Sequence, residues 1–515
     1  MIEREWREAS DLRTSRFALA AVLIAAAVLR FWALGRGIPY AVQVDEPEIV
    51  ERAVNMMRSG SLHPHFFDYP SFYIYVQLLV ACVRFVTGAI SGQWASLAEA
   101  SGGAFYLWGR AVTAALGVVT VLLVYQIGAR WGARHALLAA GLMAVLPLHV
   151  RYSHFVLTDT PLTLWVTLTL LLSLVAHERG TVRGFAWAGA AAGLAAATKY
   201  NGGVSLIMPL LACWMTLSVR PGRLQAALAA VAACIVAFLI FAPYTVLALP
   251  DFLNSFARLA REYRVADLPE PAWMLYLKLL LRHTFGWPAL LLAAGGMVMG
   301  IVRVVRGPGR VRWALVVTFP AVFFWMLISQ RIVYARYLLP MTPPLCVLAA
   351  AAVVSGVSLL RRYEIPRMAR TALIAALTTA ALLPPAIVAV RSDHDLARVG
   401  TLDLAYAWVV QNLPENASVV METRAMVLPG KFRARNVGAL RPKDYWQWRN
   451  EGVDYLIASS EVYGRFFDDN AGGPQRFPRE YGEYMRIFVQ SREIARFSPS
   501  LDHPGPELRI LKVVP

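Results

Sequence analysis

Charged residues are scarce in this sequence. Asp, Glu, Lys and Arg make up 16% of its 515 residues, whereas hydrophobic residues make up 57%. A soluble globular chain carries roughly 25% of charged residues, so the scarcity of charge excludes an ordinary soluble protein. The apolar residues gather in runs of about 20, the length that crosses a hydrocarbon core of roughly 30 Å. The composition therefore predicts a membrane protein built from many helices.

Cysteine is also scarce. The four cysteines all lie inside apolar runs, and no CxxC pair occurs. This placement excludes a disulfide framework and a thiolate metal site. We expect the four side chains to act as small apolar groups in the protein interior. They are Cys82, Cys213, Cys234 and Cys346.

Acidic residues are fewer than basic ones, 33 against 50, which gives a formal net charge of +17. The basic residues lie in short loops between apolar runs, where they set the orientation of a membrane protein. The sequence has no nucleic-acid recognition module and no basic stripe with interleaved aromatic residues. Membrane lipids are therefore expected partners, and nucleic acid is excluded.

The apolar runs predict eleven transmembrane spans. The first follows an arginine-rich N-terminal segment and is interpreted as a retained signal anchor rather than a cleaved signal peptide. A further apolar run, 71–90, is predicted to lie on or dip into the outer leaflet. If it crossed, fourteen loop arginines would move outside, against the positive-inside rule. The predicted spans lie near 17–34, 105–128, 134–150, 158–176, 185–199, 203–219, 224–248, 286–302, 313–329, 337–356 and 371–390.

This topology places the N-terminus in the cytoplasm and two large segments outside. The first is loop 35–104, which is expected to carry amphipathic or interfacial helices. The second is 392–515, which is predicted to be an extracytoplasmic α/β domain. Its expected elements are a helix at 402–412 and strands at 417–422, 453–459 and 507–514. The predicted fold is thus a polytopic α-helical membrane domain, 1–391, followed by a soluble α/β domain.

Two adjacent carboxylates, Asp45 and Glu46, stand in the first outside loop. Pro47 suits the first turn of a helix, and Asp45 suits its N-terminal cap. The residues that follow predict an amphipathic helix at the membrane surface. Helix capping is sufficient to explain Asp45 taken by itself. A carboxylate at the membrane interface also suits a general base that takes the proton of a hydroxyl group. Both interpretations stay open on the residues alone.

A divalent metal is the one cofactor that the same loop suggests. His63, His65 and Asp68 lie within six residues and have side chains that can ligate such an ion. Their spacing matches no closed zinc pattern, so a proline-containing surface loop is the alternative interpretation.

Later outside loops carry one more carboxylate and several cations. Asp159 lies at the mouth of a span, where it either caps the helix or has a functional partner. Lys199 and Tyr200 lie in a very short loop that ends in two glycines. Arginines occur in a later loop, and the planar guanidinium group of arginine can donate two hydrogen bonds at once to a phosphate group. The residues of that loop are Arg331, Arg336 and the adjacent Tyr337.

The outside surface thus combines carboxylates early in the chain with cations later. Transfer from a lipid phosphate needs both, because a base takes the acceptor's proton while cations stabilise the departing phosphate. The alternative function is a transporter or flippase of a polyprenyl-linked glycan. Transporters place their sites near the membrane midplane, whereas these polar groups gather where loops meet spans.

The motifs YPSFYIY at 69–75, TDTPLTLW at 158–165, TKYNGG at 198–203 and ARYLLPMTPP at 335–344 stand in the order of a known family. Together with Asp45-Glu46, they resemble the GT-C superfamily of glycosyltransferases. The resemblance is to its phospholipid-carrier-dependent branch, which includes protein O-mannosyltransferases and the aminoarabinose transferase of lipid A. It spans roughly the whole predicted membrane part.

The resemblance implies a bacterial inner-membrane enzyme that moves a sugar from a polyprenyl-phosphate donor. The acceptor would be an extracytoplasmic lipid, glycan or protein, and the transfer a hexosyl or pentosyl transfer with inversion. Asp45 would be the catalytic base, with Glu46 as its substitute, and Asp159 would support the acceptor or a metal. The implied donor-phosphate contacts are Lys199, Tyr200, Arg331, Arg336 and Tyr337.

Two features depart from the family pattern. The YPS stretch stands where relatives often have a basic residue before two prolines, so one donor-phosphate cation is absent or replaced. The C-terminal segment resembles the α/β tails of uncharacterised bacterial members and has no MIR-type repeat. This weakens a specific assignment to protein O-mannosylation.

Overall fold

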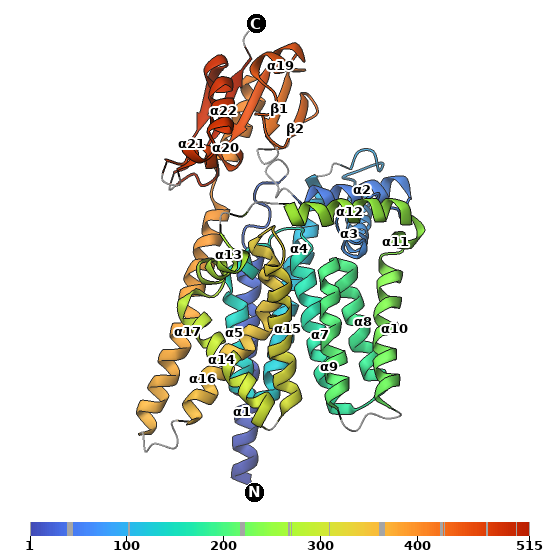
Figure 1. The fold of residues 1–515 in the computed structure, drawn as a ribbon, viewed down its shortest axis with the longest axis vertical. Helices are drawn as coiled ribbons and strands as arrows, with labels where there is room; N and C mark the ends of the chain where they lie inside the picture. The colour runs from blue at the N-terminus through green and yellow to red at the C-terminus, as the bar shows by residue number, and fades with distance from the viewer. Residues whose placement is uncertain are drawn as a thin grey trace. The chain divides into compact units, whose positions relative to one another are not determined.

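The chain folds into a predominantly helical molecule with one small β-sheet, described here from a computed structural model (Figure 1). It forms two compact units. The membrane unit comprises Met1–Leu34, Ile49–Glu99 and Trp108–Asp393, and the C-terminal unit comprises Gly35–Glu48, Ala100–Leu107 and His394–Pro515. The residues that the structure describes are 2–38, 45–100, 103–216, 222–265, 268, 270–307, 309–359, 366–422, 426, 428–469, 472–500 and 502–513.

Within the described residues, helices account for most of the predicted membrane part. They are, in chain order, α1 (Ile2–Phe31), α2 (Pro47–Ser59), α3 (Phe72–Ile90), α4 (Gly103–Gly128), η1 (Ala129–Trp131), α5 (Ala133–Val145), α6 (Pro147–Tyr152), α7 (Asp159–Arg179), α8 (Val182–Thr198), η2 (Tyr200–Leu206), α9 (Ile207–Met215), α10 (Arg223–Phe241), α11 (Tyr244–Leu247), α12 (Leu249–Val265), α13 (Ala272–Leu279), η3 (Leu280–Thr284), α14 (Gly286–Arg306), α15 (Arg310–Ile328), η4 (Ala335–Met341), α16 (Thr342–Leu359) and α17 (Arg367–Ala397).

Within the described ranges, eight helical segments are long and apolar enough to cross a membrane. These eight include α3, over the run 71–90 that is not among the predicted spans, and do not include α1, over the predicted span 17–34. The predicted spans 134–150, 185–199 and 203–219 correspond to shorter helices. The first of these ends early because Pro147 starts a new helix, α6, directly after an extended Leu146. The prediction of a polytopic helical membrane protein is confirmed. Of the fourteen loop arginines used for its orientation, Arg220, Arg361 and Arg362 lie outside the described residues.

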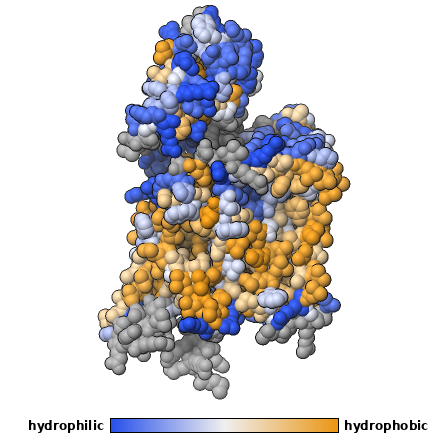
Figure 2. Space-filling view, viewed as in Figure 1, coloured by the Kyte–Doolittle hydropathy of each residue, from blue (hydrophilic) through white to orange (hydrophobic). Residues whose placement is uncertain are grey.

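The surface of the membrane unit matches this assignment. Figure 2 shows a largely hydrophobic band along the helices, with hydrophilic residues gathered toward their ends. Leu224, Leu228 and Ile240 of α10 are more than half exposed. An exposed apolar surface of this extent suits contact with lipid rather than with water.

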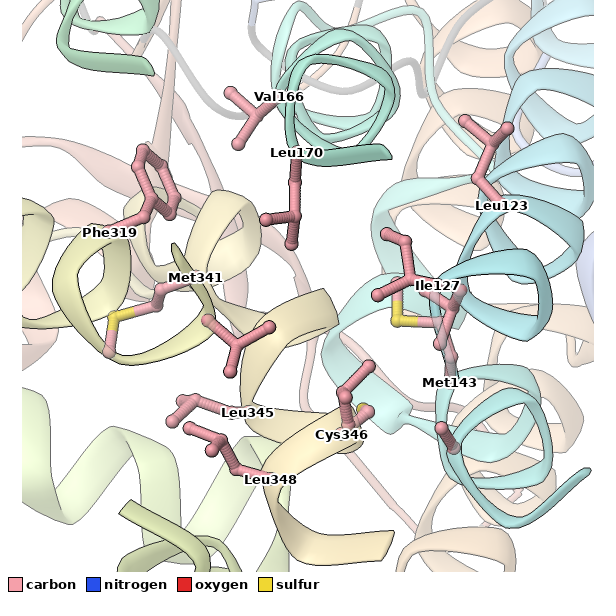
Figure 3. Packing of buried hydrophobic residues seen from close by; sticks show 14 of the residues in the cluster. Leu123, Ile127, Met143, Val166, Leu170, Phe319, Met341, Leu345, Cys346 and Leu348 are labelled. Atoms are coloured by element: carbon pink, nitrogen blue, oxygen red, sulfur yellow. The ribbon is translucent and has the colours of Figure 1, made fainter. Parts of the chain in front are cut away.

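Inside the unit, helices pack through apolar and small side chains. Figure 3 shows α4, α5, α7, α15 and α16 contributing to one core, which includes Leu170, Phe319 and Cys346. Gly189 and Gly193 of α8 face the backbone of α10, and a Cβ atom at either position would collide with it. Small residues allow this close approach of two helices where apolar surface alone gives no preference between lipid and protein.

Helix α3 contains the ambiguous run 71–90. Figure 1 draws α3 nearly end-on, whereas α7, α8 and α10 run lengthwise. Its buried face carries Tyr73, whose hydroxyl lies 2.5 Å from the hydroxyl of Thr113, and Gln77, whose amide donates to Tyr73 at 2.9 Å. This course suits an interfacial helix. By length and composition α3 can also cross a membrane, so its predicted place in the outer leaflet stays a prediction.

The C-terminal unit contains a five-stranded sheet of order β2-β1-β3-β5-β4. Strand β1 pairs in parallel with β2 and β3, whereas β5 is antiparallel to β3 and β4. The α/β prediction is confirmed, including its helix and its three strands, while β2 and β4 were not predicted. The elements are α18 (Thr401–Asn412), β1 (Ser418–Glu422), β2 (Arg433–Val437), α19 (Tyr445–Asn450), β3 (Tyr455–Ser459), α20 (Ser460–Phe467), α21 (Gly473–Arg476), α22 (Pro478–Gln490), β4 (Arg492–Phe497) and β5 (Leu508–Lys512).

Helices cover both faces of this sheet because its strands alternate their side chains. Val419 and Met421 of β1 pack on one face with Ala405 and Val409 of α18. Val420 points to the other face, where α19, α20 and α22 supply most of the apolar partners. The arrangement is a three-layer α/β sandwich.

Candidate functional site

Three helix ends in the membrane unit bring together one carboxylate and two cations. Asp159 is the first residue of α7, Lys199 directly follows α8, and Arg336 is the second residue of η4. Lys199 adopts an extended backbone conformation that ends α8. A Cβ atom at Gly202 would collide with the carbonyl of Ala195, so glycine lets the chain fold back here. We call Asp159, Lys199 and Arg336 the charge cluster.

Both carboxylate oxygens of Asp159 face a cation. The ammonium nitrogen of Lys199 donates to Oδ1 at 2.7 Å, and Nε of Arg336 lies 3.5 Å from Oδ2. The side chains of Asp159 and Lys199 are 3% and 8% exposed, and that of Arg336 is 12% exposed. The cluster is therefore a nearly buried ion triad.

Tyrosine rings surround the two cations. The Lys199 ammonium lies 4.3 Å from the ring centre of Tyr337 and 5.6 Å from that of Tyr69. The Arg336 guanidinium lies 4.4 Å from the ring centre of Tyr334. Electron-rich ring faces stabilise positive charge that has lost most of its water. The rings thus help to keep both cations charged at a site with little solvent.

A second layer of tyrosines positions the first. The hydroxyl groups of Tyr263, in α12, and Tyr337 are 2.5 Å apart, and the two rings stack in parallel. The backbone carbonyl of Tyr263 also accepts a hydrogen bond from the backbone N–H of Arg331 at 3.0 Å. Burial raises the pKa of Tyr152, in α6, and the adjacent Arg336 opposes this shift. Tyr152 therefore also lies against the cluster.

The triad has a net charge of +1, because two cations face one carboxylate. Removing one partner of a buried ion pair typically destabilises the folded protein by about 3–5 kcal/mol, because the remaining charge has no counter-charge. An anion that enters the site could share the cations with Asp159. Lysine and arginine donors together suit the oxygens of a phosphate group.

Four of the predicted site residues thus meet: Asp159, Lys199, Arg336 and Tyr337. The structure places two other predicted phosphate contacts elsewhere. Tyr200 donates its hydroxyl to the carbonyl of Phe67 at 2.9 Å and packs its ring near Phe252 and Phe256 of α12.

Arg331 is exposed, and within the described part of the chain its side chain forms no ion pair. Its backbone N–H donates to the carbonyl of Tyr263, which ties the loop to the surroundings of the cluster. A direct role of the Arg331 side chain in phosphate binding therefore stays a prediction.

Asp45 and Glu46 belong to the C-terminal unit. They precede α2, which begins at Pro47 as predicted and buries Ile49 and Val50 on one face. Asp45 is partly buried and Glu46 is fully buried. The helix is confirmed, whereas the catalytic role of either carboxylate stays a prediction.

The candidate metal ligands do not assemble. Among the described residues, no group of three His, Cys, Asp or Glu side chains is placed to hold a metal ion. Asp68 instead pairs with Arg258 of α12, and the ring of His63 lies 4.2 Å from that of Tyr244. His65 has a positive φ of 49°, as in a tight turn. The Asp68 contact fastens the segment to α12, and a divalent metal as cofactor stays a prediction.

Sequence reasoning missed Tyr69, Tyr152, Tyr263 and Tyr334 as neighbours of the cluster. Tyr69 and Tyr334 were detectable, because each lies in a loop that also carries a predicted site residue. Tyr152 was detectable in the same way, because it lies in the predicted outside loop that ends at Asp159. Tyr263 gave no such signal, since only the packing of α12 brings it to the site.

Comparisons with known proteins agree with the resemblance seen in the sequence. Residues 74–246 match the profile of the family described as dolichyl-phosphate-mannose-protein mannosyltransferase. This range includes Asp159 and Lys199, but not Arg336. No curated protein is similar enough in sequence to match the chain.

Two solved structures share the fold. The oligosaccharyltransferase of Archaeoglobus fulgidus in its apo form is 14% identical, with a TM-score of 0.58 over 88% of this chain and 70% of that chain. ArnT from Cupriavidus metallidurans bound to undecaprenyl phosphate is 15% identical, with a TM-score of 0.57 over 97% of each chain. The chain therefore has the fold of the GT-C membrane glycosyltransferases, as predicted.

Proposed function

We propose that this protein is a membrane glycosyltransferase that takes a sugar from a polyprenyl-phosphate-linked donor. The acceptor is an extracytoplasmic lipid, glycan or protein, and the protein lies in a bacterial inner membrane. The observation that carries the proposal is the buried charge cluster with its excess positive charge, set among tyrosines at three helix ends. The GT-C fold and the family match at 74–246 support it.

In this proposal, the cluster binds the donor phosphate. Lys199 and Arg336 face the phosphate oxygens, and Asp159 keeps both cations in place when the site is empty. The structure of ArnT from Cupriavidus metallidurans, which shares this fold, contains undecaprenyl phosphate. A phosphodiester carries one negative charge, which the net charge of +1 would balance.

The proposed reaction is a single displacement at the anomeric carbon. The acceptor hydroxyl oxygen forms a bond to that carbon, and the bond from the carbon to the phosphate oxygen breaks with its electron pair. Asp45 takes the hydroxyl proton, and Glu46 is its substitute. The cations stabilise the charge that grows on the departing polyprenyl phosphate. Attack opposite the leaving group inverts the configuration of a hexosyl or pentosyl unit.

The test is an assay with the purified protein in lipid nanodiscs. A set of polyprenyl-phosphate sugars is supplied with extracts that contain lipid, glycan and protein acceptors. We expect release of polyprenyl phosphate together with a glycosylated acceptor, and Lys199→Ala should abolish both. In vesicles, a flippase would instead move labelled donor across the bilayer without cleaving it. Translocation of intact donor without release of polyprenyl phosphate would contradict the proposal.

A further inference from the structure

A buried histidine and a buried carboxyl group, neither part of the charge cluster, face one another in the membrane unit. His154 lies just after α6, and Asp393 lies near the C-terminal end of α17. They are 3% and 4% exposed. Nε2 of His154 is 3.7 Å from Oδ1 of Asp393. Buried charged or polar side chains without partners are costly, so this pair calls for a physical explanation.

The hydrogen bonds of the histidine fix its tautomer. Nδ1 lies 2.9 Å from the carbonyl oxygen of Val150, and a carbonyl can only accept, so Nδ1 carries a hydrogen. In a neutral ring, Nε2 then has a lone pair that points toward the carboxyl group of Asp393. Within the described residues, neither Nε2 nor either oxygen of Asp393 has a hydrogen-bond partner. A lone pair facing an ionised carboxylate would be repulsive.

We propose that His154 and Asp393 form a buried proton-binding site that holds one proton between Nε2 and the carboxyl group. The proton comes from solvent, and no other bond is made or broken. With the proton in place, the carboxyl group donates to Nε2 and the pair closes to hydrogen-bond distance. Without it, a carboxylate is left in a nearly dry environment opposite a lone pair.

The surroundings of the pair decide where the proton resides. Burial lowers the pKa of His154 to about 4, and the carbonyl groups of Val150 and Trp32 only partly oppose this shift. The imidazole is therefore neutral near pH 7, so a proton bound by the pair resides on the carboxyl group of Asp393.

Three arginines form the charged environment of the pair: Arg30 of α1, Arg110 of α4 and Arg151 of α6. Arg30 is fully buried. Its terminal nitrogens donate to the carbonyls of Met143 and Ala144 and face Nδ1 of His149, a second histidine, in α6. These hydrogen bonds hold the terminal nitrogens of Arg30 on α5 and α6, and the charge of Arg30 acts on Asp393 without a hydrogen bond between the two side chains.

The location gives the proton a structural consequence. Asp393 is the last residue of the membrane unit, and the chain passes into the C-terminal unit directly after it. His154 lies on the short segment between α6 and Asp159. The bound proton therefore fastens the end of α17 to the segment that leads into the charge cluster. A rise in pH that removes the proton weakens this contact between α17 and the segment that carries His154.

Infrared difference spectroscopy of the purified full-length protein tests the proposal. We expect a carbonyl-stretch band of a protonated carboxyl group at neutral pH, lost on raising the pH. The band should be missing from Asp393→Asn and retained in Asp395→Asn, a control at an exposed carboxylate two residues away. If Asp393→Asn leaves the band unchanged, the band belongs to another carboxyl group, and the proposal is wrong.

A second measurement is independent of the spectrum and of any transferase activity. Stability from a bound proton is present at low pH and is lost as the pH rises through the titration. The thermal midpoint of the wild type should therefore fall over that range. The thermal midpoint of Asp393→Asn should stay constant over the same pH range, because the amide N–H of the asparagine still donates to Nε2 and does not titrate. Equal pH dependence of the two proteins would overturn the proposal.

Discussion

Asp45 is the residue on which the proposed proton transfer depends. It stands two residues before Pro47, at the start of α2. We predict that Asp45→Asn lowers the transfer rate by about 10²–10⁴-fold, the usual cost of losing a general base. The measurement is single-turnover transfer at saturating donor, with the thermal midpoint recorded to show that the variant is folded. Near-normal turnover would remove Asp45 from this role and direct attention first to Glu46 and then to Asp159.

Arg336 tests the binding of the donor phosphate. Arg336→Lys keeps the positive charge but loses the planar guanidinium group with its paired donors. The rate of transfer at a given donor concentration should therefore fall clearly. Arg336→Ala should lower kcat further, by about 10²–10³-fold, because the leaving phosphate loses one donor. The matched control is Arg331→Ala, in the same loop but with an exposed side chain. Identical dependence of rate on donor concentration in the wild type and both Arg336 variants would exclude Arg336 from phosphate binding.

At the scale of elements, the end of α12 reaches the charge cluster through Tyr263 and Tyr337. If the Tyr263 hydroxyl donates to Tyr337, the Tyr337 proton is free to point to the donor phosphate. We predict that Tyr263→Phe raises KM for the donor by up to about tenfold with a smaller change in kcat, because the neutral hydrogen bond that orients the Tyr337 hydroxyl is lost.

Tyr276→Phe is the control for this change. The Tyr276 hydroxyl bonds the carbonyl of Ile332 at 3.4 Å, so its removal loosens the same loop without touching Tyr337. An equal loss in both variants would mean that Tyr263 merely supports the loop.

Strand β1 ends in a buried carboxyl group, Glu422, which accepts hydrogen bonds from the Ser459 and Leu440 N–H groups and the Tyr484 hydroxyl. Burial raises its pKa above the ordinary value. The folded unit therefore binds this proton more tightly than the unfolded chain does, and the resulting stability is lost as the pH rises through the raised pKa. We predict that Glu422→Gln removes this pH dependence.

The measurement is resistance of the C-terminal unit to limited proteolysis in the full-length protein between pH 4 and pH 8. Going from neutral to acidic pH should protect the wild type more than Glu422→Gln. Glu415→Gln, at an exposed position, should behave as the wild type does. Parallel pH profiles of wild type and Glu422→Gln would count against a titrating Glu422.

At the scale of the whole molecule, orientation in the membrane is the open prediction. The positive-inside rule places the loop arginines in the cytoplasm, which puts 392–515 outside and keeps 71–90 from crossing. We predict that a reporter active only outside the cytoplasm is active when fused at the C-terminus. Fusions after Arg130 and after Arg306, in predicted cytoplasmic loops, should be inactive. A C-terminal reporter that works only in the cytoplasm would reverse the topology.

The sequence by itself determined the class of the protein, most of its helices and three strands of its sheet. Hydropathy and loop charge are local properties, and a run of apolar residues must form a helix in lipid to satisfy its own backbone groups. The motifs around Asp159, Lys199 and Arg336 were visible for the same reason, because they interrupt apolar runs.

Only the tertiary structure decided which of these groups meet. Asp159 and Lys199 pair across two helices, and Arg336 joins them from η4, whereas the predicted contacts Tyr200 and Arg331 lie differently. The pair of His154 and Asp393 was likewise invisible, because its members lie far apart in the chain. The physical reason is that helix packing fixes which helix ends adjoin, and local sequence patterns carry little information about that packing.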